Sequence, residues 1–243
     1  MTALHLADPR DAAALGAFLA RLLRYDKAAA VRLRTANGAL AVFARLPLGE
    51  SGPLVIRTAA LADPPARTAS GRTASGRISG VGDDAGELDL TVSAGQLLDG
   101  IDNTHASAGA GTLPLPVPIT GPAWAGLLPP RTPWEHVADL PVGPLAAAVR
   151  AAVTEFRRES ADPDGLAEAI WSRQVHSSGL TLRALHAAHL VGLLQQSSPE
   201  RSGAGTVALH RHPAWLRLTA PRGSVIIRRA PAIGSGLGLT PTR

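Results

Sequence analysis

The sequence contains no cysteine. The chain therefore cannot form disulfides, use a thiolate nucleophile, or bind zinc or an iron-sulfur cluster through sulfur. No apolar run approaches the roughly 18 residues that a membrane span needs. A secretory signal peptide has a basic start followed by an apolar stretch, but this chain carries Asp8 and Asp11 in that region. These absences lead us to expect a cytoplasmic, soluble protein.

Lysine is almost absent, because Lys27 is the only one among 24 lysine and arginine residues. Two explanations stay open at this point. The codon bias of a GC-rich genome produces arginine, alanine, glycine and proline in excess. Alternatively, arginines gathered on one face would serve an acidic partner or a nucleic acid, because a guanidinium binds carboxylates and phosphates through paired hydrogen bonds.

Complete catalytic and cofactor motifs are also missing. The chain has no Gly-x-Ser-x-Gly at a strand-to-helix turn and no phosphate loop ending in Gly-Lys-Ser/Thr. Residues 234–238 (GSGLG) share the glycine spacing of a dinucleotide loop. Only five residues follow them, too few for the helix that would hold a pyrophosphate. We therefore expect no cofactor and favour a protein that is not an enzyme.

The first hundred residues predict a helix, four strands and a second helix. Asp8-Pro9 is typical of a helix start, and apolar residues spaced by three and four predict a helix over residues 9–25. Apolar and polar residues alternate on both sides of Asn37-Gly38, which predicts a hairpin over residues 29–45. Strands are expected over residues 54–58 and 87–92. Ser93 and Gln96 then predict a capping box for a short helix.

Two segments of biased composition interrupt these patterns. Residues 68–77 repeat Thr-Ala-Ser-Gly-Arg directly, which predicts a mobile loop because such residues bury little apolar surface. Residues 106–144 contain nine prolines, which disfavour helix interiors and central strands. Trp124 and Trp134 lie in the same segment and argue against a free linker. We expect an extended strap packed on a neighbouring surface.

The C-terminal part predicts three helices and a hairpin. Helices are expected over residues 144–160, from Asp162-Pro163 through Val175 toward Gly179, and from Thr181 to about residue 194. Residues 215–219 and 224–229 are expected to form two strands around a four-residue turn. The predicted fold is α+β: an N-terminal helix on a small antiparallel sheet (1–105), a Pro/Gly-rich strap (106–144), and C-terminal helices closed by a β-hairpin (145–243). These segments pack as one unit or two.

The last 43 residues contain seven arginines and no aspartate or glutamate. This asymmetry predicts a contact face on the hairpin, and we expect a non-catalytic interaction or regulatory protein that turns this face toward an acidic protein partner. The expected binding residues are Arg211, Arg217, Arg222, Arg228 and Arg229.

Nucleic-acid binding is the alternative, because three helices followed by a hairpin is the element order of a winged helix, and phosphates favour a surface without carboxylates. The helix that would read base edges counts against it. Between Thr181 and Leu194 that helix offers Arg183 and two histidines, with no Asn, Gln or Lys.

A metal site is a weaker hypothesis. His186 and His189 lie one helical turn apart, and His176, His210 and His212 lie in the same third of the chain. No His-Glu-x-x-His spacing is present, and no carboxylate lies between residues 181 and 196. We therefore predict no metal site.

Overall fold

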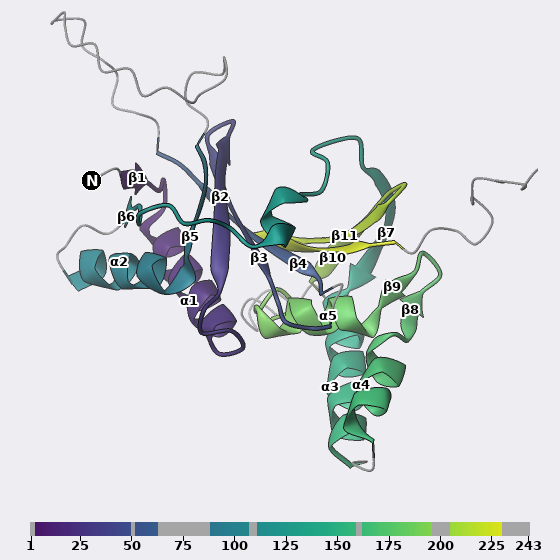
Figure 1. Ribbon diagram of the computed structural model, residues 1–243. Coiled ribbons are helices and arrows are strands. Elements are labelled where there is room, and N and C mark those ends of the chain that lie inside the picture. The colour runs from purple at the N-terminus through teal and green to yellow at the C-terminus, as the bar shows by residue number, and fades with distance from the viewer. Residues whose placement is uncertain are drawn as a thin grey trace, which may run out of the picture. The chain divides into compact units, whose positions relative to one another are not determined.

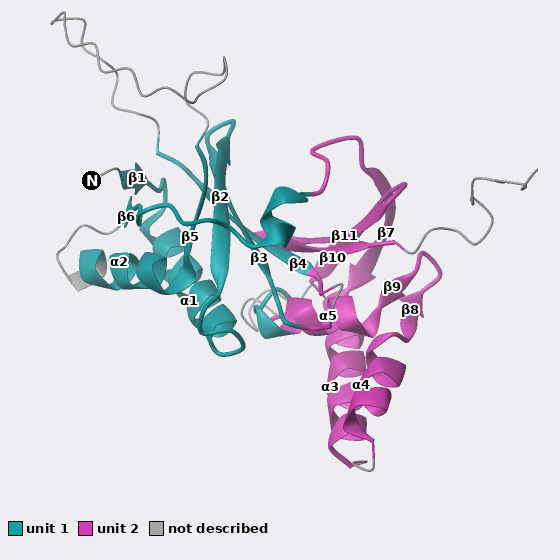
Figure 2. Cartoon of the chain, in the orientation of Figure 1, with its two compact units in different colours: residues 1–47, 54–128, 190–193 teal, residues 48–53, 129–189, 194–243 magenta. Residues whose placement is uncertain are grey.

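The computed structural model describes residues 3–49, 52–62, 88–106, 111–158, 162–195 and 205–229 (Figure 1). These residues form an α+β fold with five α-helices and antiparallel sheets, as the sequence predicted. The chain divides into two compact units (Figure 2). The first comprises residues 1–47, 54–128 and 190–193, and the second comprises residues 48–53, 129–189 and 194–243. In the described part of the chain no helix is both long and apolar enough to cross a bilayer.

The first unit holds two helices over a sheet. The helices are α1 (Pro9–Leu23) and α2 (Ala94–Ala106), and a short 3-10 helix, η1, spans Ala123–Gly126. The sheet order is β5-β2-β3-β4, all antiparallel, and β1 pairs separately with β6. The strands are β1 (Ala3–His5), β2 (Ala30–Ala36), β3 (Ala39–Arg45), β4 (Leu54–Ala60), β5 (Asp89–Ser93) and β6 (Thr112–Pro114).

Local chemistry explains where these elements begin and turn. Asp8 is the N-cap of α1, and its Oδ1 accepts a hydrogen bond from the Arg10 backbone N–H at 2.8 Å. Asn37 and Gly38 both have positive φ, 49° and 71°, which is the conformation a two-residue hairpin turn needs. The predicted helix start and hairpin are therefore confirmed. The short strands β1 and β6 were not predicted.

The core of the first unit lies between the helices and one face of its sheet. Leu33 of β2 and Val42 of β3 face each other across the strands and are fully buried. Phe18 and Leu19 of α1 and Ile101 of α2 are buried as well, and α1 and α2 pack side by side. Each such side chain contributes about 1.5–3 kcal/mol when it leaves water.

The second unit repeats this plan with a meander of strands. Its sheet order is β12-β11-β10-β7, again antiparallel. The helix α3 packs against α4 and against β7. The elements are β7 (Glu135–Pro141), α3 (Val142–Arg158), α4 (Pro163–Trp171), β8 (Gln174–His176), β9 (Leu180–Thr181), α5 (Leu182–Leu190), β10 (Thr206–His212), β11 (Trp215–Ala220) and β12 (Gly223–Arg228).

Three details of the second unit differ from the sequence predictions. The helix predicted to run through Val175 ends at Trp171, because residues 174–176 form β8 and pair with β9 around a turn at Gly179, whose φ is 93°. The predicted hairpin is present as β11 and β12, but β10 and β7 extend it into a wider sheet. The proline-rich segment was expected to be an extended strap. It contains β7, where Pro141 occupies the last position of a strand that pairs with β10.

Some predictions fall outside the described residues. These are the loop over residues 68–77, the glycine-rich residues 234–238, the first residue of the strand predicted over 87–92, and Arg201 and Arg243. The division of the chain at residues 105 and 144 stays a prediction.

Candidate aromatic-cationic face

The two faces of the C-terminal sheet differ in chemistry because side chains alternate along each strand. Val207 and Leu209 of β10 and Leu216 and Leu218 of β11 are buried on one face. The opposite face carries most of the aromatic and basic side chains of these strands, among them His210, Trp215 and Arg217. We call this surface the aromatic-cationic face. It consists of Trp134, His136, His210, His212, Trp215, Arg217 and Arg228.

Strand register arranges the face in two rows. In one row His212 of β10 stands opposite Trp215 of β11, which stands opposite Arg228 of β12. In the next row His136 of β7 stands opposite His210, which stands opposite Arg217. Adjacent strands are about 4.8 Å apart, so each row extends across the sheet in steps of that size.

Two tryptophans hold the two arginines of the face in place. The guanidinium carbon of Arg217 lies 5.9 Å from the ring centroid of Trp134, and that of Arg228 lies 5.0 Å from the ring centroid of Trp215. The indole N–H of Trp134 donates to the carbonyl of Pro130 at 3.0 Å, which fixes the ring. Cation-π contacts of this kind contribute about 0.5–2 kcal/mol and orient the guanidinium groups.

A bulge in β7 brings an acidic residue onto the same face. The register shifts between Leu209 and His210, so that Leu209 pairs with Ala138 while His210 pairs with His136. Residues three apart in a regular strand lie on opposite faces, but the extra residue keeps His136 and Asp139 together. Their Nε2 and Oδ1 atoms lie 3.2 Å apart.

Burial changes the electrostatics around Arg217. The Nε atom of Arg217 is buried and has no hydrogen-bond partner within the described structure, and burial lowers the pKa of this guanidinium. The pKa of His210 is lowered by burial first, then by the charges of Arg217 and His136. Asp139 and the Ala208 backbone oppose this shift. Arg217 therefore carries the permanent positive charge of the row that contains His136 and His210, and Asp139 is the acidic residue close to that row.

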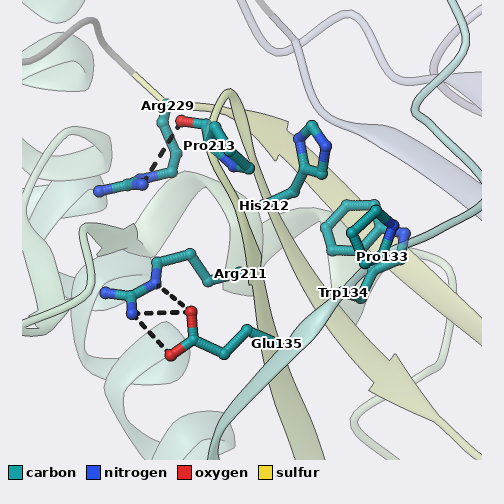
Figure 3. A pocket seen from close by; sticks show the side chains of 7 residues that line it. All are labelled: Pro133, Trp134, Glu135, Arg211, His212, Pro213 and Arg229. Carbon is teal, nitrogen blue, oxygen red and sulfur yellow. Dashed lines mark hydrogen bonds and ion pairs between the residues drawn. The ribbon is translucent and has the colours of Figure 1, made fainter.

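Arg211 lies on the other face of β10 and forms an ion pair. It donates two hydrogen bonds from Nη2 to Glu135, at 2.7 and 2.8 Å, and one from Nε at 3.2 Å. The pair borders a pocket of about 450 Å³ (Figure 3). Figure 3 shows the guanidinium groups of Arg211 and Arg229 on one side of β10, with His212 and Trp134 on the other. Arg229 donates to the Pro213 carbonyl at 3.4 Å.

The structure thus separates the five arginines that the sequence grouped together. Arg217 and Arg228 share the aromatic-cationic face, whereas Arg211 and Arg229 border the pocket. Arg222 is exposed in the turn between β11 and β12, at the end of the hairpin away from Arg228. The described residues do not form a single surface that contains all five arginines.

The helix that a winged-helix protein would place in the DNA groove is largely internal. Five of the nine residues of α5 are buried, among them Leu182 and Leu185. His186 of this helix stacks on Trp171, with ring centroids 4.2 Å apart and planes inclined by 13°. Burial and, secondarily, the charge of His189 lower the pKa of His186 to about 4. No three side chains of His, Asp or Glu gather as metal ligands in the residues the structure describes.

Sequence reasoning missed the aromatic partners of the arginines. Trp134 lies in the proline-rich segment, and only the pairing of β7 with β10 brings it close to Arg217. The period-two alternation of residues 206–212 (TVALHRH) is a signal that could have identified β10. With β10 in place, His210 and His212 belong on one face together with Trp215 and Arg217.

Comparison with protein families gives two matches. A family described as "Domain of unknown function (DUF8010)" matches residues 1–126, and one described as "Domain of unknown function (DUF8185)" matches residues 129–232. The change from one match to the other falls where the first compact unit gives way to the second, at residues 128 and 129. No curated protein matches the chain.

Solved structures similar to the chain include bacterial sliding clamps. A DNA polymerase sliding clamp from Caulobacter crescentus is 12% identical, with a TM-score of 0.46, and the match covers 94% of this chain and 65% of the clamp. A DNA polymerase sliding clamp from Pseudomonas aeruginosa is 11% identical, with a TM-score of 0.47 and coverages of 93% and 64%. The Helicobacter pylori beta clamp bound to a DNA ligase peptide is 10% identical, with a TM-score of 0.46 and coverages of 98% and 70%. The chain thus spans about two thirds of the length of these clamps.

Proposed function

This chain belongs to the family described as domain of unknown function DUF8010, and we propose that it is a non-catalytic interaction protein whose aromatic-cationic face binds an acidic segment of a partner protein. The observation that carries the proposal is the pairing of Arg217 with Trp134 and of Arg228 with Trp215 on one sheet face. Among the described residues no carboxylate forms an ion pair with either arginine. Their charge is therefore available to an external anion.

The composition of the face suits a protein partner. Tryptophan and arginine are the residues that most often carry the binding energy of protein interfaces, because they bury a large area and lose little side-chain entropy when already held in place. Here the stacking on Trp134 and Trp215 holds both guanidinium groups before any partner arrives. Such preorganisation lowers the entropic cost of binding.

The amount of charge favours an acidic protein segment over a nucleic acid. Proteins that bind duplex DNA with marked salt dependence neutralise about 6–10 phosphates. The aromatic-cationic face carries two arginines, and burial lowers the pKa of its His210. It also holds Asp139, which a phosphate backbone would avoid. The helix that a winged-helix protein would use to read base edges, α5, is largely buried.

The decisive experiment reverses the charge of the face. Affinity capture from an extract of the native cells would use the full chain, the double variant Arg217→Glu/Arg228→Glu, and the control Arg150→Glu. Arg150 is exposed on α3, so its substitution changes charge away from the sheet. We expect one protein to be retained by the wild type and the control and to be lost with the double variant.

A photo-crosslinker at Thr219, which stands beside the face on β11, identifies the segment that binds. The proposal requires the crosslinked segment to be rich in aspartate and glutamate. A crosslinked segment without acidic residues would overturn it, as would equal retention by all three proteins. Binding to mixed nucleic acids with a steep loss between 50 and 200 mM salt would instead support the nucleic-acid alternative.

A further inference from the structure

Arg217 differs in its surroundings from three other arginines of the second unit. Arg211, Arg173 and Arg183 each form an ion pair with a glutamate. Arg217 is half-buried, and its Nε–H donor is buried without an acceptor in the described structure. A buried charge without a counter-ion is unfavourable, because water no longer solvates it and no carboxylate replaces the water.

No carboxylate of the described residues forms an ion pair with the guanidinium of Arg217. In the strand register Arg217 pairs with His210 of β10 and with the buried Ile226 of β12, and the Trp134 ring lies 5.9 Å from its guanidinium carbon. His136 and Asp139 of β7 lie one strand further, beyond β10. Asp139 is the acidic residue of this set, and it is paired with His136 at 3.2 Å. The hydroxyl of Thr219 lies 3.4 Å from Nδ1 of His210, which leaves Nε2 of that ring as its second polar atom.

We infer that Arg217 and His210 together form a site that receives one carboxylate of the acidic segment. This inference rests on the proposed function and names the chemistry of its central contact. A carboxylate accepts two parallel hydrogen bonds from a guanidinium, and this geometry is shorter and stronger than a bond between neutral groups. One carboxylate also matches the single permanent positive charge of Arg217, whereas a doubly charged phosphate would require a second fixed cation.

The same arrangement couples binding to protonation. A carboxylate at Arg217 stabilises the charged form of His210 and cancels the repulsion by Arg217 that contributes to its low pKa in the free protein. The pKa of His210 is therefore higher in the complex than in the free chain. The tightest binding occurs at acidic pH and is lost as the pH rises through the pKa of the complex. One proton changes affinity by at most about tenfold per pH unit.

The test uses a fluorescein-labelled decaglutamate peptide with the full chain at low salt, between pH 5.5 and 8. Glutamate side chains stay ionised across this range. We expect Arg217→Gln to weaken binding by about tenfold or more, and Arg217→Lys to weaken it less because the charge remains. His210→Gln should flatten the pH dependence, whereas His136→Gln should retain most of it. Arg150→Gln and a decaglutamine peptide are the matched controls.

A second measurement does not depend on substitutions. Titration of the histidine ring signals by NMR, without and with decaglutamate, should show the pKa of His210 rising on binding. An unchanged pKa of His210 in the presence of bound peptide would overturn the inference even if Arg217→Gln fails to fold.

The outcomes separate this inference from the proposed function. If decaglutamate binds, and Arg228→Gln or Trp215→Ala weakens it while Arg217→Gln does not, the carboxylate site is wrong and the proposed function stands. If decaglutamate and decaaspartate both fail to bind, both proposals are overturned. If inorganic phosphate displaces decaglutamate at a lower concentration than acetate does, the site prefers phosphate and the assignment to a carboxylate is wrong.

Discussion

Arg211 and Glu135 face each other with both carboxylate oxygens held by one guanidinium nitrogen, at 2.7 and 2.8 Å. The pair joins β10 to β7 across 76 positions of sequence. The C-terminal segment has arginines and no acidic residues, but the pair shows that its arginines can still have acidic partners. Glu135 comes from an earlier segment and supplies a carboxylate to Arg211. A segment without acidic residues can therefore still lie next to a carboxylate in the folded chain.

Because this ion pair is exposed, its removal should cost little. The side chains of Arg211 and Glu135 are 43% and 63% exposed, and exposed pairs contribute about 0.2–1 kcal/mol. We expect Glu135→Gln and Arg211→Gln each to lower the free energy of unfolding by less than about 1 kcal/mol in urea denaturation. Decaglutamate should bind Arg211→Gln within about twofold of the wild type. A loss of binding comparable to that of Arg217→Gln would mean that Arg211 also takes part in binding.

The assignment of the two sheet faces predicts that substitutions at neighbouring positions lower the free energy of unfolding by very different amounts. Leu209 is fully buried on β10, so Leu209→Ala should cost about 2–5 kcal/mol through a lost side chain and a cavity. Leu209→Met, which keeps the volume, should cost less than about 1.5 kcal/mol. His210→Ala, on the other face, should cost much less than Leu209→Ala. Equal costs at the two positions in urea denaturation would mean that the register of β10 is wrong.

Local signals predicted the elements whose cause lies within a few residues. The turn at Asn37-Gly38 needs positive φ at both positions, and Asp8 caps the helix that begins at Pro9. Both features depend only on residues that are adjacent in the sequence. The same holds for the hairpin of β11 and β12, whose short turn carries Pro221 and Arg222.

Long-range pairing explains what the sequence did not predict. Trp134 and Arg217 meet because β7 pairs with β10, and prolines around residue 134 concealed the strand. Val175 was assigned to a helix because apolar spacing alone does not separate a helix from a short strand that follows it. The five arginines were grouped because they are close in sequence, but alternation sends Arg211 and Arg217 to opposite faces of the sheet.

The cap of α1 offers a test of local stability. Oδ1 of Asp8 accepts the backbone hydrogen bond of Arg10, and a carboxylate at this end also interacts favourably with the helix dipole. Asp8→Ala should lower the free energy of unfolding by about 0.5–2 kcal/mol. Asp8→Asn, which keeps the acceptor, should recover most of this loss in the same thermal or urea measurement. If both substitutions are neutral, the cap does not stabilise the helix.

The stacked His186 predicts a pH dependence of stability. Its pKa is about 4 in the folded chain, mainly through burial, and about 6.5 in an unfolded chain. The unfolded state therefore binds more protons between these values. The stabilising contribution is complete above pH 6.5 and is lost as the pH falls to 4.

The shift of the pKa corresponds to a loss of at most about 3 kcal/mol in the free energy of unfolding. Solvent that reaches the ring makes the loss smaller. His186→Phe keeps a ring over Trp171 and does not titrate. Urea denaturation of both proteins at several pH values should therefore show the wild type losing more stability than the variant on acidification. Parallel pH profiles would contradict the assignment.

The connectivity of the C-terminal sheet sets an order of assembly. Strands β10, β11 and β12 follow one another through two tight turns, so their pairing closes short loops, whereas β7 is separated from β10 by three helices. Closing the short loops is entropically cheaper and faster. Trp215 and Arg228 therefore meet early during folding, while Trp134 reaches Arg217 only when β7 docks. A chain that has formed the meander alone presents five of the seven residues of the aromatic-cationic face, and the face is complete only when the edge strand β7 has docked.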